Sequence, residues 1–109
     1  MEVFGPEATG LSHQDVDVTD GIGVTLALQA LKPDWVLNTA AYNRVDDCEI
    51  NPGLALGVNT LGAHNVARAA AAVGAGVVFF STDYVFSGRD RGPHEPYDEN
   101  DRPEPLPCT

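Results

Sequence analysis

Hydrophobic and polar residues alternate along the chain in blocks that predict strands and helices in turn. The clearest block is residues 76–80, where a continuous apolar run follows Gly76. Such a run predicts a strand buried on both faces, as in the interior of a parallel sheet. Further strands are expected at residues 2–5, 15–18 and 35–40, the first of them a weak candidate because it is short and terminal.

A helix is expected after residues 15–18. Thr19 or Asp20 can cap it, because a short oxygen-bearing side chain accepts hydrogen bonds from the first free amides of a helix. The helix is expected to end before Pro33. Its apolar face is expected to consist of Ile22, Val24, Leu26, Leu28 and Leu31.

A longer helix is expected over residues 52–73. Asn51 is its expected N-cap, Pro52 suits the first helical position, and Gly74 closes it. The apolar positions that can face a sheet are Val58, Leu61, Val66, Ala69 and Ala70. Residues 46–49 before this helix read as a solvated acidic loop rather than a metal site, and residues 87–109 as a loop or extended tail.

The alternation of strands and helices with short connections predicts an α/β fold, part of a doubly wound parallel sheet with flanking helices. Right-handed crossovers bring the ends of parallel strands to one rim, where ligands bind. The segments that reach this rim are residues 17–18 at the end of one expected strand, residues 40–43 at the end of the next, and residues 81–84 after the apolar run. Their convergence favours nucleotide or dinucleotide binding.

Composition limits the partners. The net charge of −10 argues against nucleic acid and against an anionic membrane surface. The sequence has no apolar stretch of the roughly 18 residues that a membrane span needs. Cys48 and Cys108 are isolated, which is typical of free thiols in a reducing cytoplasm and gives no metal motif.

Four stretches carry a family resemblance. They are residues 17–20 (Asp-Val-Thr-Asp), residues 38–46 (Asn-Thr-Ala-Ala-Tyr-Asn-Arg-Val-Asp), Asn59, and residues 81–86 (Ser-Thr-Asp-Tyr-Val-Phe). In this order they resemble the dTDP-4-dehydrorhamnose reductases, which are extended short-chain dehydrogenases/reductases with a Rossmann-type domain. Residues 96–101 and 105–106 also resemble the loop before the catalytic helix of that family.

The resemblance implies an oxidoreductase that uses NADPH or NADH to reduce the 4-keto group of a dTDP-linked sugar in dTDP-L-rhamnose biosynthesis. It assigns the cofactor to Asp17, Val18, Ala41, Tyr42, Asn43 and Phe80. It assigns the substrate to Val45, Thr82, Asp83 and Tyr84, with the Thr82 hydroxyl as the catalytic donor to the substrate oxygen. Such a donor is needed because negative charge builds on the ketone oxygen as hydride arrives.

Several of these roles have simpler alternatives. Asp17 could be a solvated residue before a helix, Thr82 could bond to backbone in a turn, and Asp83 could cap the following segment. Asn59 lies inside the expected helix, where asparagine is unfavourable, so we expect its side chain to hold two elements together by hydrogen bonds.

Two family features are missing from residues 1–109. The sequence has no glycine-rich turn for the cofactor pyrophosphate, since the glycines at 5, 10, 21 and 23 do not fit one. It also has no Tyr-x-x-x-Lys pair after Leu106, where Thr109 stands in place of the tyrosine. We therefore expect a partial NAD(P)-binding domain without the substrate domain, with weak cofactor binding and no turnover by itself.

Two other functions stay open on the same scaffold. One is a non-catalytic module that binds a partner enzyme, like the regulatory subunit of methionine adenosyltransferase. The other is a fragment of a nucleotide-sugar epimerase or dehydratase, although the sequence after Ser81-Thr82 favours the reductase.

Overall fold

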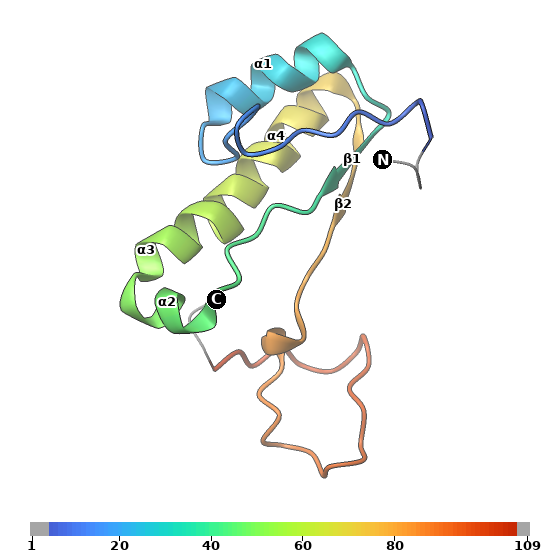
Figure 1. The fold of residues 1–109 in the computed structure, drawn as a ribbon. Coiled ribbons are helices and arrows are strands. Elements are labelled where there is room, and N and C mark those ends of the chain that lie inside the picture. The colour runs from blue at the N-terminus through green and yellow to red at the C-terminus, as the bar shows by residue number, and fades with distance from the viewer. Residues whose placement is uncertain (1–4, 107–109) are drawn as a thin grey trace.

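The computed structural model describes residues 5–106 and contains two parallel strands with helices packed beside them (Figure 1). In chain order the elements are α1 (Gly21–Leu31), β1 (Trp35–Asn38), α2 (Val45–Ile50), α3 (Pro52–Ala55), the π-helix η1 (Leu56–Gly62), α4 (Ala63–Val73), β2 (Gly76–Phe79) and the 3-10 helix η2 (Asp83–Val85). The strand expected at residues 2–5 lies outside the described residues except for Gly5.

β1 and β2 pair in parallel, with Trp35 opposite Gly76 and Asn38 opposite Phe79. Both strands were expected, and each ends before its expected boundary, at residue 38 instead of 40 and at residue 79 instead of 80. Gly76 allows the pair to form, because a Cβ there would lie only 2.5 Å from the ring of Trp35. The parallel α/β arrangement is therefore confirmed for this pair.

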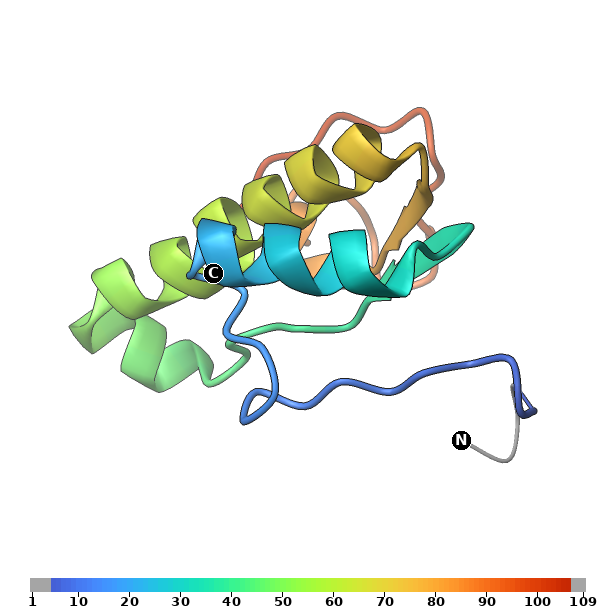
Figure 2. The same cartoon turned by 90° about the horizontal axis from the view of Figure 1, so that it is seen from above.

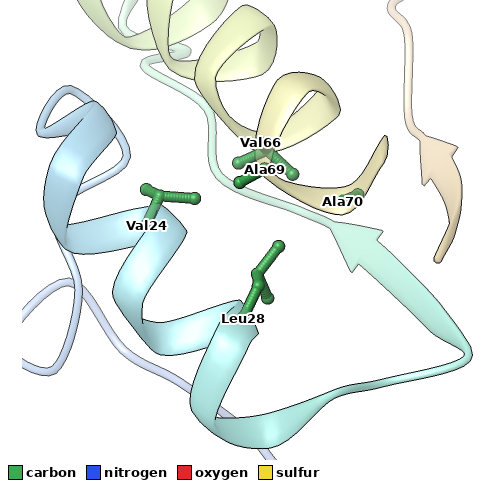
Figure 3. Packing of buried hydrophobic residues seen from close by; sticks show 5 residues of the cluster. All are labelled: Val24, Leu28, Val66, Ala69 and Ala70. Carbon is green, nitrogen blue, oxygen red and sulfur yellow. The ribbon is translucent and has the colours of Figure 1, made fainter. Parts of the chain in front are cut away.

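The core lies between α1 and α4, which run side by side (Figures 2 and 3). It consists of Val24 and Leu28 from α1 and of Val66, Ala69 and Ala70 from α4. The expected apolar face of α1 was partly wrong, since Ile22 and Leu26 are 75% and 61% exposed. A helix has about 3.6 residues per turn, so positions 24 and 28 share a face that positions 22 and 26 do not.

Residues 15–18 do not form the expected strand. Ser12 donates its amide and its hydroxyl to the carboxylate of Asp15, at 2.7 and 2.6 Å. Thr19 does the same to Asp17, at 2.9 and 2.8 Å. These carboxylates form local turns that compete with strand pairing, which is why alternation of polar and apolar residues misled the prediction here.

The expected helix over residues 52–73 is continuous but includes the π-helical segment η1, and Gly74 closes it in the left-handed conformation with φ 75°. Pro52 takes the first turn as expected, whereas the Asn51 side chain makes no cap bond. Leu61 is 54% exposed, contrary to its expected place against a sheet. The wider π turn changes which side of the helix each position occupies.

The expected acidic loop is instead the helix α2. Its two aspartates lie in the first turn, where negative charge is favourable beside the free amides of the helix. Arg44 pairs with Asp47 at 2.8 Å, and the side chain of Cys48 is completely buried. The buried thiol shows that α2 packs against the rest of the molecule.

β2 is not buried on both faces as expected. Val78, Phe79 and Phe80 are 39%, 52% and 59% exposed. Within residues 5–106 the sheet has two strands, and β2 pairs only with β1. An apolar run indicates a strand that is suited to burial. Whether it is buried depends on the strands and helices that pack against it in the tertiary structure.

Residues 87–106 contain no helix or strand, as expected for this part of the chain. They form an ordered loop, because Arg91 pairs with Asp101 and the Glu104 amide donates to the Val85 carbonyl at 2.8 Å. No helix in residues 5–106 is long and apolar enough to cross a bilayer.

Candidate functional site

A groove of about 490 Å³ lies where β1 and β2 end. This is the crevice at the carboxyl ends of parallel strands where α/β proteins bind ligands. Its wall combines apolar and polar side chains. The lining residues are Asn38, Thr39, Ala40, Ala41, Tyr42, Asn43, Val45, Asn59, Thr60, Phe79, Phe80, Ser81, Thr82, Tyr84 and Val85.

The segment after β1 is held along the groove by a side chain of η1. The Tyr42 amide donates to Asn59 Oδ1 at 2.7 Å, and Asn59 Nδ2 donates to the Tyr42 carbonyl at 2.9 Å. This confirms that the Asn59 side chain joins two elements. At the start of the segment, Asn38 is buried and its Oδ1 accepts from the Ala40 amide at 3.1 Å. The segment is thus fixed at both ends without belonging to the sheet.

Thr82 stands at the start of η2, after β2. Its Oγ1 accepts from the Tyr84 amide at 3.2 Å and lies 3.4 Å from Asp83 Oδ1. The turn bond expected as the simpler alternative for Thr82 is therefore present. The hydroxyl accepts in this turn bond and donates to Asp83 Oδ1 over the long distance of 3.4 Å, so donation to a ligand in the groove would replace the bond to Asp83.

The structure brings most of the sequence-predicted site residues into this one groove. They are Ala41, Tyr42, Asn43, Val45, Phe80, Thr82 and Tyr84. The first four follow β1 and the last three follow β2, which is the convergence that parallel pairing predicts. Asp17, Val18 and Asp83 do not line it.

Asp17 and Val18 lie in the turn before α1. The Asp17 carboxylate accepts from the amide and hydroxyl of Thr19, and these two bonds lower the pKa of Asp17 below its usual 3.8. Val18 packs against the core and lies close to Gly62, where a Cβ would come within 2.7 Å of Val18 Cγ2. The turn is therefore docked on the long helix, away from the groove.

Asp83 lines a second hollow, of about 500 Å³, together with Tyr84 and Tyr97. The ring of Tyr97 stacks on Phe86, with centroids 4.3 Å apart, and the Arg91 guanidinium lies 4.8 Å from the Tyr97 centroid. Tyr97 also donates its hydroxyl to Asp90. Tyr84 lines both this hollow and the first groove.

Several lining residues were missed as site residues, among them Asn38, Thr39, Thr60 and Val85. Asn38 and Thr39 could have been predicted, because they are polar residues at the end of a predicted strand. Thr60 could not, since it reaches the groove only because η1 lies beside the segment after β1. The described residues contain no cluster of three or more His, Cys, Asp or Glu suited to a metal ion.

The glycines at the start of α1 do not form a phosphate cradle. Asp20 caps this helix, and its Oδ1 accepts from the Ile22 amide at 3.1 Å. A Cβ at Gly23 would lie 2.6 Å from Asp20 Oδ2. The carboxylate occupies the place that an anion would take at the helix N-terminus and would repel it.

A parallel strand pair, a helical crossover and a groove at the carboxyl ends of both strands define part of a Rossmann-type α/β domain. The chain belongs to the RmlD substrate binding domain family, which matches residues 2–108. The family resemblance read from residues 17–20, 38–46 and 81–86 is therefore confirmed.

Two curated relatives illustrate the range of proteins to which this chain is similar. A dTDP-4-dehydrorhamnose reductase of Streptomyces griseus is 41% identical over 90 residues, which cover 83% of this chain and 30% of that protein. Methionine adenosyltransferase 2 subunit beta of Xenopus laevis is 36% identical over 91 residues, covering 84% and 26%. The chain thus spans about 30% of the length of the curated relatives that it matches.

Solved structures agree with the fold. A dTDP-4-dehydrorhamnose reductase of Clostridium acetobutylicum superposes with a TM-score of 0.85 at 40% identity, covering 90% of this chain and 34% of that one. A dTDP-4-dehydrorhamnose reductase of Bacillus anthracis in complex with NADP gives 0.84, also at 40% identity and with the same coverage.

Proposed function

We propose that this chain contributes the nicotinamide end of the cofactor cleft and one catalytic hydroxyl to a dTDP-4-dehydrorhamnose reductase. The observation that carries the proposal is the groove that joins the segment after β1 to Thr82 after β2. Residues 1–109 then form part of an NAD(P)-binding Rossmann domain, with residues 87–109 as its loop. The similarity to proteins named dTDP-4-dehydrorhamnose reductase supports this proposal.

The groove fits one end of a dinucleotide. At about 490 Å³ it lies in the range of small-molecule sites and is too small for a whole dinucleotide and a sugar nucleotide together. Ala40 and Ala41 have small side chains, so a ring can approach their main chain closely. Phe80 is 59% exposed at the groove and offers an apolar surface to a ring.

The bound NADPH or NADH supplies the hydride in this proposal. Thr82 donates a hydrogen bond to the 4-keto oxygen of the dTDP-linked sugar, where negative charge develops. Ala41, Tyr42, Asn43 and Phe80 hold the cofactor, and Val45, Asp83 and Tyr84 contact the sugar nucleotide. Asp17 and Val18 contact the adenine end of the cofactor. They lie in the turn before α1, so the adenine end would bind outside the groove.

Binding is the direct test, because residues 1–109 contain no Tyr-x-x-x-Lys pair. The ¹⁵N-labelled 109-residue chain is titrated with NADPH and, separately, with dTDP-glucose, and amide shifts are followed by NMR. We expect weak binding, with NADPH shifting amides in residues 39–43 and 79–82. We expect dTDP-glucose to shift amides in residues 82–85.

Thr82→Val is the matched variant for the sugar nucleotide, because it keeps the size of the side chain and removes the hydroxyl. It should weaken dTDP-glucose binding by a larger factor than NADPH binding. Shifts scattered over the whole molecule, or no shift with either ligand at millimolar concentration, would contradict the proposed function.

A second candidate is a non-catalytic module that binds a partner enzyme. It is favoured by the similarity to methionine adenosyltransferase 2 subunit beta. Co-purification of the chain with a methionine adenosyltransferase, combined with no ligand-induced shift in the groove, would support this candidate over the reductase.

A further inference from the structure

Two asparagines of the long helical rod formed by α3, η1 and α4 reach the main chain of two distant loops. Asn59 bonds to both main-chain polar groups of Tyr42, at 2.7 and 2.9 Å. Asn65 Nδ2 donates to the Val18 carbonyl at 3.0 Å and to the Thr19 carbonyl at 3.3 Å. One rod therefore holds the loop before α1 and the loop after β1.

The surroundings of Asn65 are shaped to accept its side chain. A Cβ at Gly21 would lie 3.0 Å from Asn65 Oδ1, so a larger residue there would crowd the amide. Gly62 lies one helical turn before Asn65 and leaves room for Val18, because a Cβ at position 62 would lie 2.7 Å from Val18 Cγ2. Glycine at both positions lets the loop lie directly on the rod.

The two asparagines can act independently. Positions six residues apart on an α-helix differ by about 120° around the axis, so the side chains leave the rod on different sides. The π turns of η1, which contains Asn59, adjust this angle further. Asparagine is unfavourable inside a helix relative to alanine by up to about 0.7 kcal/mol, and hydrogen bonds to the loops offset that penalty.

We propose that Asn59 and Asn65 are positioning residues that fix the two halves of a dinucleotide site separately. Asn59 sets the loop at the nicotinamide half through the Tyr42 main chain. Asn65 sets the loop at the adenine half through the carbonyls of Val18 and Thr19. The inference rests on the proposed function, which assigns these two loops to the two ends of the cofactor.

The test uses half-cofactors, so that each loop is probed by its own ligand. Wild type, Asn59→Ala and Asn65→Ala are titrated by NMR with AMP and with nicotinamide mononucleotide. We expect Asn59→Ala to weaken nicotinamide mononucleotide about 5- to 10-fold and to leave AMP unchanged. We expect Asn65→Ala to weaken AMP by a similar factor and to leave nicotinamide mononucleotide unchanged.

This crossed pattern separates positioning from general destabilisation. Asn51→Ala is the matched control, because the Asn51 side chain makes no cap bond, and it should affect neither ligand. If both ligands weaken equally in both variants, or if neither changes, the positioning role is refuted. Should Asn59→Ala not fold, Asn59→Asp retains the acceptor for the Tyr42 amide and tests the same loop.

Failure of the proposed function would look different. Wild type would then bind neither half-cofactor, which rejects a dinucleotide site and the ligand part of the inference with it. Amide hydrogen exchange still tests whether Asn59 and Asn65 fix the two loops independently of each other. The Tyr42 amide should exchange faster in Asn59→Ala and at the wild-type rate in Asn65→Ala, and equal acceleration in both would refute that independence.

Discussion

The side-chain amide of Asn59 pairs with both the N–H and the C=O of Tyr42, 17 residues earlier in the chain. A side-chain amide that donates and accepts in this way makes the two main-chain hydrogen bonds that a neighbouring strand would make to Tyr42. The segment after β1 therefore keeps a fixed course where it leaves the sheet. This course defines one wall of the groove.

Removing this amide should destabilise the fold. Asn59→Ala leaves the half-buried Tyr42 amide without its partner and leaves the Tyr42 carbonyl with only the Cys48 thiol at 3.8 Å. We expect the free energy of unfolding to fall by about 1–3 kcal/mol. Urea unfolding followed by far-UV circular dichroism measures the change. Thr60→Ala, at an exposed neighbouring position, should change stability by less than about 0.5 kcal/mol. Equal losses in both variants would contradict the assignment.

The two expected helix caps differ in the structure and should differ in energy. Asp20 accepts from the Ile22 amide at 3.1 Å, whereas the Asn51 side chain makes no cap bond. We expect Asp20→Ala to cost about 0.5–2 kcal/mol. Asn51→Ala should cost a few tenths at most. Thermal unfolding of the two variants under one set of conditions decides this, and a reversed order would rule out the capping geometry.

Gly62 is expected to resist substitution for steric reasons. A Cβ there would lie 2.7 Å from Val18 Cγ2, and valine has little rotamer freedom with which to yield. Gly62→Ala should therefore destabilise by about 1–3 kcal/mol, as overpacking does. At Gly53 a Cβ meets nothing within 4 Å, so Gly53→Ala should leave stability unchanged or raise it by up to about 1 kcal/mol. Denaturant midpoints of the two variants provide the comparison.

The turn before α1 should weaken in acid. Bonds from the amide and the hydroxyl of Thr19 lower the pKa of Asp17 below 3.8, so its contribution to stability is present above the pKa of the unfolded chain. That contribution is lost as the pH falls through the lower pKa of the folded state. Asp17→Asn should reduce the pH dependence of the unfolding free energy below about pH 5. An unchanged acid slope in this variant would argue against the turn.

Tyr97 should titrate above its usual value of 10.0. The hydrogen bond to the Asp90 carboxylate raises the pKa of Tyr97, so its contribution to stability holds below the unfolded pKa and is lost as the pH rises through the folded one. Phenolate absorbance measures the titration, and Tyr97→Phe identifies the transition that belongs to Tyr97. Asp90→Asn should move that transition to lower pH, and no movement would show that the bond does not form in solution.

Most of the secondary-structure elements, and the family, could be predicted from local patterns in the sequence. Spacing and capping residues were enough for β1, β2, α1 and the ends of the long helix, because these depend on interactions within a few residues. Short motifs at residues 38–46 and 81–86 were enough for the family and for most of the groove. An isolated asparagine in a helix was enough to predict a long-range hydrogen bond, although not its partner.

Features that depend on neighbours distant in sequence could be seen only in the folded chain. The apolar run of β2 gave no sign that its residues would stay exposed, since burial requires a partner layer that residues 5–106 do not supply. The carboxylates of Asp15 and Asp17 turned an alternating segment into two turns. Only the folded chain showed that Asn59 reaches Tyr42 and that Asp17 lies apart from the groove, because hydrogen-bond partners and distances follow from packing and not from order along the chain.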